Sequence, residues 1–366
     1  MERQWVSWEK IEEVMVKTFK HVGIPEMDAY LCADVLMESD RRGIESHGVN
    51  RFKPIYIDRI MAGIQKPTTK IDILKETPTT AVLDANDGMG MVASHKAMKM
   101  AIDKAKKYGM GMVAVRNSTH YGIAGYYVTM ATKENMIGMT GTNARPSIAP
   151  TFGVENMLGT NPLTIGLPTD EEFPFVLDCA TSITQRGKIE YFAKINKETP
   201  SGMVIGRDGK PKTNSDQILV DLTKGEAALA PLGGIGEELA GYKGYGYATV
   251  VEVLSAALQA GSFLKMLTGV DEEGMKKPYN LGHFFIAIDT EAFMGSEIFK
   301  KTAGEIMRQL RNSKRAPGQD KIYTAGEKEY LSFLERKDKG VPLNEGVKED
   351  FKKVVEMFEL EIDLPF

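Results

Sequence analysis

The stretch Gly43-Ile44-Glu45-Ser46-His47-Gly48-Val49-Asn50-Arg51 is the part of this sequence from which its interpretation starts. If the stretch is helical, His47 and Arg51 share a face, because positions four apart are neighbours on a helix. An imidazole exchanges a proton near neutral pH, and a guanidinium holds a carboxylate through two parallel hydrogen bonds. The pair therefore suits chemistry on a small organic acid. The alternative is a capped helix end with a surface His and Arg.

The chain has 366 residues, which allows two or three packed lobes. Its net charge of −4 gives no reason to expect nucleic acid or an anionic membrane as a partner. Two cysteines are too few for a disulfide framework and fit a reducing compartment. The N-terminus lacks the apolar run of a signal peptide, and no stretch approaches 18 apolar residues. We therefore expect a cytoplasmic protein.

Apolar residues at helical spacing lie near both ends of the chain and predict helices there, over about 7–22, 25–42, 52–62, 296–312 and 345–359. Short strands alternate with helices in between, the strands being expected at 80–84, 112–115, 136–142, 163–167, 173–178 and 284–289. The helices of this part are expected at 93–108, 122–134, 181–194 and 248–263. Residues 197–232 are polar and rich in Gly and Pro, which predicts a long loop or small excursion.

This order predicts a mixed α/β protein with two lobes. Residues 1–78 and 290–366 would form a helical lobe built from both chain ends. Residues 79–289 would form an α/β lobe that binds cofactor and substrate. Periodicity alone does not order the strands.

The run Gly88-Met89-Gly90-Met91-Val92-Ala93 formally matches the dinucleotide-binding pattern G-x-G-x-x-G/A, between a predicted strand and a predicted helix. The acidic residue expected about 20 positions later, at the end of a second strand, is absent from 109–115. The alternative is a tight turn that needs positive φ.

Polar residues at a second strand–helix junction, Asn117-Ser118-Thr119-His120-Tyr121-Gly122, suit an anion at a helix start or simple capping. His120 is a proton carrier, a cofactor contact or part of a cap. In the loop that follows the next strand, Arg145 is a candidate for a second carboxylate, or a surface charge. Asp178 caps the helix after it, orients a His or binds a ribose. Lys243, before another helix, is a candidate for a cofactor phosphate.

Two other classes of site find no support in the sequence. The five histidines show no H-E-x-x-H spacing, so we predict no metal site. No G-x-S-x-G elbow supports a serine hydrolase.

Taken in order, the motifs resemble the type-2 malate/L-lactate dehydrogenase family, which also includes sulfolactate, ureidoglycolate, diketogulonate and piperideine-carboxylate oxidoreductases. The resemblance covers about residues 5–335. It rests on Ser46-His47-Gly48 with Arg51, Asn117-Ser118-x-His120-Tyr121-Gly122, Gly159-Thr160-Asn161-Pro162, Asp178-x-Ala180-Thr181-Ser182, Gly187-Lys188, Gly241-Tyr242-Lys243-Gly244 and Asn280-x-Gly282-His283-Phe284.

The resemblance implies a non-Rossmann fold with a largely antiparallel central sheet, helices from both chain ends packed together, and a homodimer or larger assembly. It implies NAD or NADP as cofactor, and catalytic roles for Ser46, His47 and His120. It places substrate contacts at Arg51, Arg145 and Thr160. Cofactor contacts are implied at His120, Tyr121, Gly122, Asp178, Cys179, Ala180 and Lys243.

The reaction implied is hydride transfer between the cofactor and a 2-hydroxy or 2-oxo acid, with a His as general acid or base. Arg145 and Arg186 are candidates for a second cation, which favours a diacid and hence malate/oxaloacetate. The alternatives are another 2-oxo acid such as sulfopyruvate or pyruvate, a cyclic imine, or a homologue that binds nucleotide without catalysis.

Overall fold

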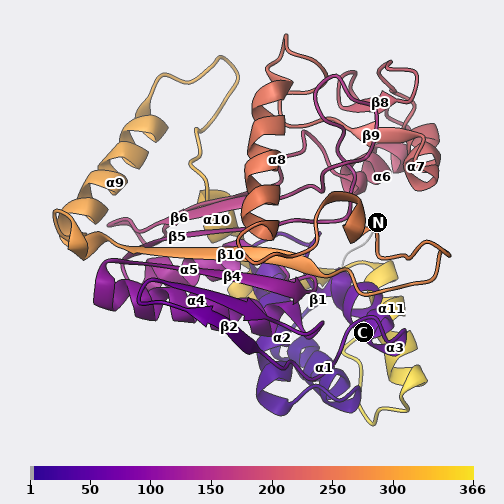
Figure 1. The fold of residues 1–366 in the computed structure, drawn as a ribbon, viewed down its shortest axis with the longest axis horizontal. Helices are drawn as coiled ribbons and strands as arrows, with labels where there is room; N and C mark the ends of the chain where they lie inside the picture. Colours follow the sequence, from indigo (N-terminus) through magenta and orange to yellow (C-terminus); the bar gives the residue numbers. More distant parts are fainter. Residues whose placement is uncertain (1–3) are drawn as a thin grey trace.

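The computed structural model describes residues 4–366 and has a seven-stranded sheet at its centre (Figure 1). In spatial order the strands are β2 (Asp72–Glu76), β3 (Thr80–Asp84), β4 (Met110–Ser118), β10 (Leu281–Asp289), β5 (Met136–Thr142), β6 (Leu163–Leu167) and β7 (Phe175–Cys179). Only β3 and β4 run parallel, and every other neighbouring pair is antiparallel. The predicted non-Rossmann, largely antiparallel sheet is confirmed.

Two helices cover one face of this sheet, α4 (Gly90–Tyr108) and α5 (Gly125–Lys133) (Figure 1). The α4 helix presents a stripe of buried alanines, including Ala97 and Ala101, to Val113 and Phe285 of the strands. The small side chains let the helix lie close to the sheet. A β-carbon at Gly111 of β4 would lie 2.3 Å from the Ala101 carbonyl oxygen, so the two backbones nearly touch there.

The Gly88–Gly90 turn does not form a dinucleotide-binding loop. The Gly90 N–H donates to the Thr119 hydroxyl at 2.9 Å, and a β-carbon at Gly90 would lie 2.2 Å from the Thr119 carbonyl oxygen. Gly90 is therefore needed because the turn packs against the segment that carries His120, and Gly88 because the turn also packs against Thr69, 2.8 Å from where a β-carbon would lie.

Segments from both chain ends pack together at one end of the sheet, as predicted. From the N-terminal side come β1 (Gln4–Val6), α1 (Trp8–His21), α2 (Glu26–Arg41), the 3-10 turn η1 (Val49–Arg51), the π-helical turn η2 (Phe52–Ile57) and α3 (Asp58–Met61). From the C-terminal side come α10 (Glu327–Lys339), β11 (Val341–Leu343) and α11 (Glu345–Met357). β1 pairs with β11, α2 contacts α10, and Phe52 stacks on Phe351 at 5.3 Å. The sequence analysis missed β1 and α10, since β1 is very short and α10 is highly charged.

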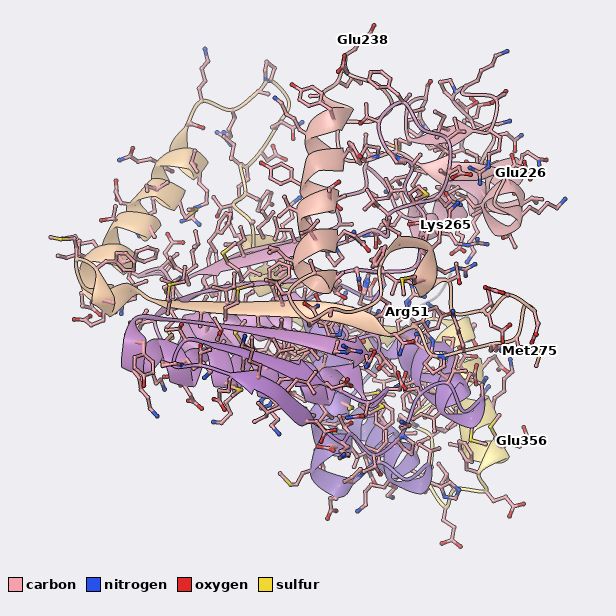
Figure 2. All side chains as sticks on the ribbon, viewed as in Figure 1. Arg51, Glu226, Glu238, Lys265, Met275 and Glu356 are labelled. Carbon is pink, nitrogen blue, oxygen red and sulfur yellow. The ribbon has the colours of Figure 1, made fainter. Side chains whose placement is uncertain are left out.

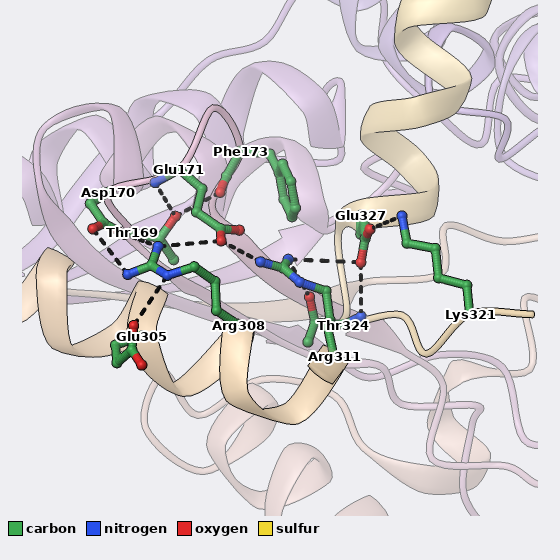
Figure 3. A network of polar contacts seen from close by, with 10 residues as sticks. All are labelled: Thr169, Asp170, Glu171, Phe173, Glu305, Arg308, Arg311, Lys321, Thr324 and Glu327. Atoms are coloured by element: carbon green, nitrogen blue, oxygen red, sulfur yellow. Dashed lines mark hydrogen bonds and ion pairs between the residues drawn. The ribbon is translucent and has the colours of Figure 1, made fainter. Parts of the chain in front are cut away.

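The α9 helix (Ser296–Asn312) lies apart from this cluster, on the opposite face of the sheet from α4 and α5 (Figure 1). Its basic residues bind the loop between β6 and β7 and the start of α10 (Figure 3). Arg308 donates to Asp170 at 2.9 Å, and Arg311 pairs with Glu171 and lies 3.8 Å from Glu327. Because such ion pairs are individually weak, it is the network that fixes the position of α9.

A small unit stands on the same face as α9, and residues 197–232, for which the sequence predicted a long loop or a small excursion, form part of it. It contains α6 (Arg186–Lys194), β8 (Val204–Gly206), α7 (Ser215–Lys224) and β9 (Ala227–Leu229), followed by the long helix α8 (Gly241–Ala256) and the 3-10 turn η3 (Leu264–Leu267). The remaining 3-10 turn, η4 (Thr290–Ala292), follows β10. Ile189, Val204, Ile218 and Ala248 share a core of their own. Few apolar side chains form this core. Because polar residues dominate this part of the sequence, the hydrophobic pattern that would indicate a core is weak there.

The division into a helical lobe of 1–78 and 290–366 and an α/β lobe of 79–289 stays a prediction, and residues 1–3 of it lie outside the described residues. Within residues 4–366, no helix is long and apolar enough to cross a membrane. The same residues contain no group of three or more His, Cys, Asp or Glu placed to hold a metal ion.

Candidate active site

The Ser-His-Gly segment is not the helix that the spacing of His47 and Arg51 assumed. It is a series of turns that leads into η1, and the Arg51 Nε donates to the Ser46 carbonyl oxygen at 2.6 Å. The buried carboxylate of Asp40, near the end of α2, accepts the Val49 N–H at 2.6 Å. A β-carbon at Gly48 would lie 1.8 Å from that carboxylate, so only glycine lets the segment approach it.

Burial raises the pKa of Asp40 to about 7, although the Val49 N–H and the charge of Arg336 both lower it. Between about pH 4 and about pH 7 the Asp40 carboxyl therefore keeps a proton in the folded protein that it has lost in the unfolded chain. Because of this, the free energy of unfolding decreases as the pH rises through that range. We expect Asp40→Asn, whose amide oxygen still accepts the Val49 N–H, to be more stable than the wild type at pH 8, by on the order of 3–4 kcal/mol at most. Urea unfolding at several pH values measures this. Equal pH dependence in both proteins would contradict it.

His47 lies on this loop, half-buried, and its Nδ1 is 2.9 Å from the Ser46 hydroxyl. Burial, followed by the charge of Arg51, lowers the pKa of His47 to about 4. The ring is therefore neutral at pH 7, and the Ser46 contact leaves Nε2 available for another partner.

His120 comes from the segment between β4 and α5 and is held by η2. Its Nδ1 lies 2.7 Å from the Tyr56 hydroxyl and accepts the Gly122 N–H at 3.3 Å. Because an N–H can only donate, Nδ1 accepts from Gly122 when the ring proton is on Nε2. The Tyr56 hydroxyl can also accept, so the other neutral tautomer donates its Nδ1–H to Tyr56. Burial lowers the pKa of His120 well below its usual range, and the closeness of His47, Arg59 and Arg51 adds to this.

The two rings meet nearly parallel, with their centroids 6.0 Å apart and their planes inclined by 16°. Within residues 4–366, Nε2 of neither ring has a hydrogen-bond partner. Arg51 follows His47 by four positions, and Figure 2 shows it on the side of the molecule that carries the Met275 loop. The fold thus brings together two neutral imidazoles and a guanidinium that the sequence separates by up to 73 positions.

Of the predicted substrate residues, Arg51 and Arg145 both act electrostatically on Arg59, a residue of the 52–62 segment that the sequence analysis did not single out. Arg145 is exposed on its loop. Thr160 is half-buried, and its carbonyl oxygen accepts the Thr181 N–H at 2.9 Å. No local signal in the sequence distinguishes Arg59 from other isolated cations.

Of the predicted cofactor residues, Asp178 contacts the start of α5, the helix that follows the His120 segment. The carboxylate of Asp178, at the end of β7, accepts the Gly125 N–H at 2.7 Å and the Thr164 hydroxyl at 2.9 Å. It therefore caps α5 and not the helix that follows it in sequence, which begins only at Arg186. A cavity of about 140 Å³ adjoins these groups and is lined by Ile44, Gly125, Asp178 and others.

Other predicted residues are placed less directly. Cys179 is the last residue of β7 and Ala180 follows it, and both are half-buried. The Tyr121 side chain is buried in the core and stacks on the buried His283 at 4.6 Å, so only its backbone is left for a ligand. Gly122 adopts a φ of +78°, and a β-carbon there would lie 2.5 Å from Val35.

Two cations are not brought to the histidines. Arg186 lies on α6, exposed, and binds Glu190 at 3.0 Å and Thr223 at 3.1 Å. Lys243 lies in the first turn of α8, and Figure 2 shows Glu238, just before that helix, at the end of α8 remote from the sheet and from Arg51. Within one chain, Arg186 is therefore not the second substrate cation.

His283 lies on β10 and is completely buried. Its Nδ1 is 2.7 Å from the Thr142 hydroxyl and its Nε2 is 2.7 Å from the Ser118 hydroxyl. Burial lowers its pKa to about 3. With both nitrogens engaged, this His is part of the core beneath the site.

The model of one protein family, described as malate/L-lactate dehydrogenase, matches residues 6–352 of this chain. The chain belongs to the malate/L-lactate dehydrogenase family. Among relatives, a malate dehydrogenase of Pyrococcus horikoshii is 40% identical over 95% of this chain and 94% of its own length. An L-sulfolactate dehydrogenase of Methanocaldococcus jannaschii is 38% identical over 97% of each chain.

Solved structures of the malate/L-lactate dehydrogenase family agree. The crystal structure of malate dehydrogenase from Entamoeba histolytica is 45% identical, covers 100% of both chains and superposes with a TM-score of 0.95. The expected family, its fold and its assignment as a dehydrogenase of 2-hydroxy acids are thus confirmed. The fit extends over the whole chain, including the small unit to which residues 197–232 belong.

Proposed function

We propose that this enzyme interconverts malate and oxaloacetate with NAD or NADP. The observation that carries the proposal is the pair of neutral imidazoles, each with an unengaged Nε2, beside Arg51 and a second arginine. Two guanidiniums suit a substrate with two carboxylates, and the imidazoles supply the proton carrier that ketone reduction requires. The names of the relatives support the same substrate.

His120 is our candidate for the group that exchanges a proton with the substrate oxygen. In the direction of oxidation Nε2 must carry no proton, which is the neutral tautomer whose Nδ1–H donates to the Tyr56 hydroxyl. The lowered pKa of His120 keeps the ring neutral, and Nε2 then takes the proton of the substrate hydroxyl. Tyr56 and Gly122 fix the ring through Nδ1, so Nε2 faces the reaction. Ser46 and His47 form the second catalytic pair, and Arg51 orients the carboxylate next to the reacting carbon.

The residues around Asp178 suit one part of a nucleotide. The cavity of about 140 Å³ is smaller than a dinucleotide needs, so it would take a single ring. The buried hydroxyls of Ser147, between β5 and β6, and of Ser182, after β7, have no hydrogen-bond partner within residues 4–366. Buried polar groups normally have a partner, which supports a polar ligand at the loops that carry these two serines. A bound nicotinamide supplies and accepts the hydride. We propose that the nicotinamide cofactor is held by His120, Tyr121, Gly122, Asp178, Cys179 and Ala180. Lys243 would contribute to this site from a partner subunit.

Initial rates of NADH and NADPH oxidation with oxaloacetate, sulfopyruvate, pyruvate and a cyclic imine test the proposal. We expect oxaloacetate to have the highest kcat/KM with one of the two cofactors. A higher kcat/KM for another acid would identify that acid as the substrate and leave the proposed hydride transfer unchanged. Nucleotide binding with no turnover of any substrate would indicate a binding protein instead.

We also propose that the enzyme is a homodimer that uses the outer faces of α8 and α9. Helix α8 is apolar on all sides, although its outer face is exposed, with Val250 at 50% and Val253 at 52%. Helix α9 exposes Ile298, Ile306 and Leu310 on the same side of the sheet (Figure 1). A helix that is apolar all round is normally buried, so a second copy is the natural cover.

Replacing Val250 and Val253 together with Glu is expected to give a monomer, because burying two charges in an apolar interface costs several kcal/mol. Light scattering coupled to size-exclusion chromatography measures the mass. The control is Val220→Glu on α7, where the valine is also exposed, at 44%. A dimer that survives the double change would place the interface elsewhere.

The compartment that we propose is the cytoplasm. Both cysteines are unpaired, Cys32 being buried in the helical cluster and Cys179 half-buried, as a reducing compartment allows.

A further inference from the structure

Arg59 is half-buried and has no acidic partner. Its guanidinium carbon lies 4.3 Å from the centre of the Tyr279 ring, and no carboxylate of residues 4–366 forms an ion pair with it. Tyr279 in turn packs so closely on Gly269 that a β-carbon there would lie 2.5 Å from the ring. The guanidinium is therefore stacked on a fixed aromatic plane and held ready, with its hydrogen-bond donors unused.

Its neighbours increase the local positive charge instead of compensating it. Arg51 and Arg145 act on Arg59, and Arg51 and Arg59 act on His120. One N–H group of Arg51, Nε–H, donates to the Ser46 carbonyl oxygen. Neither Arg51 nor Arg145 forms an ion pair with a carboxylate of residues 4–366. Seven other arginines of the described chain, at 41, 42, 116, 186, 308, 311 and 336, each pair with an acid. Arg207 and Arg315 also lack an ion pair with an acid, but each donates to a backbone carbonyl oxygen, of Val154 and Asp320. What distinguishes Arg51, Arg59 and Arg145 is that three such guanidiniums lie around one site.

Like charges repel, and Arg51 and Arg59, which are half-buried, are also partly stripped of water, so this arrangement is costly without an anion. A mono-acid would compensate only one guanidinium. An anion with two acid groups compensates two, and each group can accept the parallel N–H donors of one arginine. The site is thus built for a dianion.

We propose that Arg59 holds the second acid group of the substrate, a carboxylate or sulfonate, and selects substrates with two acid groups over those with one. The inference rests on the proposed function, in which Arg51 holds the acid group beside the reacting carbon. Arg59 suits the distal group because it lies close enough to His120 to act on it electrostatically, while stacking on Tyr279 holds its guanidinium in place. Arg145, exposed on its loop, is less constrained and can only assist.

The test compares kcat/KM for oxaloacetate with kcat/KM for pyruvate in the wild type, Arg59→Met and Arg59→Gln. We expect the oxaloacetate/pyruvate ratio to fall about 10- to 100-fold in both variants, because a charged hydrogen-bonded contact of this kind is lost. Arg186→Met is the matched control, since it removes an exposed guanidinium far from the histidines, and its ratio should equal that of the wild type. Equal losses for both substrates, or no change in the ratio, would overturn the inference.

A binding measurement separates this inference from the proposed function. With NADH present, the melting temperature is measured with succinate, which has two carboxylates and no reacting carbonyl, and with butyrate, which has one. We expect succinate to stabilise the wild type more than butyrate, and this preference to disappear in Arg59→Met. If the wild type does not reduce oxaloacetate but keeps this Arg59-dependent preference, the proposed substrate fails and the dianion site stands. Absence of the preference in the wild type would refute the site.

Discussion

Replacing His120 with Ala is expected to lower kcat for oxaloacetate reduction by about 10²- to 10⁴-fold, while KM changes little. The reason is geometric. His120 is the imidazole whose Nδ1 is engaged by Tyr56 and Gly122, and whose remaining nitrogen is left to face the substrate oxygen. Steady-state rates over a range of substrate concentrations, with the cofactor saturating, measure both constants.

His47→Ala and His21→Ala are the companion variants. His47 adjoins Ser46 and Arg51, so its loss should raise KM as well as lower kcat. His21 stacks on Phe358 outside the site and should leave both constants unchanged. The proton role of His120 would be wrong if His47→Ala lost far more of kcat than His120→Ala did.

The pH dependence of kcat/KM distinguishes a change in proton transfer from a loss of folded protein. Because burial and positive neighbours lower the pKa of His120, the base for malate oxidation is neutral over the whole neutral range. We therefore expect kcat/KM for malate oxidation to stay level from about pH 6 upward and to fall only in acid. In Tyr56→Phe, which lacks the hydroxyl on Nδ1, we expect kcat to fall about tenfold with the ring still present.

Changing Gly48 to Ala is the second large effect that we expect. The new methyl carbon would lie 1.8 Å from one Asp40 oxygen and 2.4 Å from its carboxyl carbon, so the buried carboxylate must leave the Val49 N–H. Overpacking of this kind costs typically about 1–3 kcal/mol. Because the same turn positions Ser46, His47 and Arg51, kcat/KM should fall at least about 100-fold, as displacements near 1 Å do in active sites.

The clash with Asp40 can be tested by a double-mutant cycle. In an Asp40→Ala background the space is open, so Gly48→Ala should cost much less stability there than in the wild type. Gly187→Ala on α6 is the control, since its β-carbon would meet nothing within 4 Å. Equal destabilisation in both backgrounds would show that the glycine is needed for another reason.

Local chemistry and most secondary structure could be predicted from the sequence. Side-chain periodicity placed α1, α2, α4, α5 and α9 within a few residues of their observed bounds, because an amphipathic helix has its signal within one stretch. The ordered motifs around Ser46-His47, His120 and Asp178 indicated the family, which the whole-chain match confirms. The missing acid after Gly90 argued correctly against a dinucleotide-binding loop at that turn.

Tertiary structure alone decided which of these residues meet. The insertion of β10 between β4 and β5 makes the sheet antiparallel, and no local pattern encodes a pairing between strands about 140–170 residues apart. Arg186 and Arg59 are equivalent in sequence as isolated cations. Packing leaves Arg186 paired with Glu190 on the surface and holds Arg59 against Tyr279 beside the histidines. The choice between them depends on long-range packing and on which charges are left without a partner, and neither is a property of a single stretch of chain.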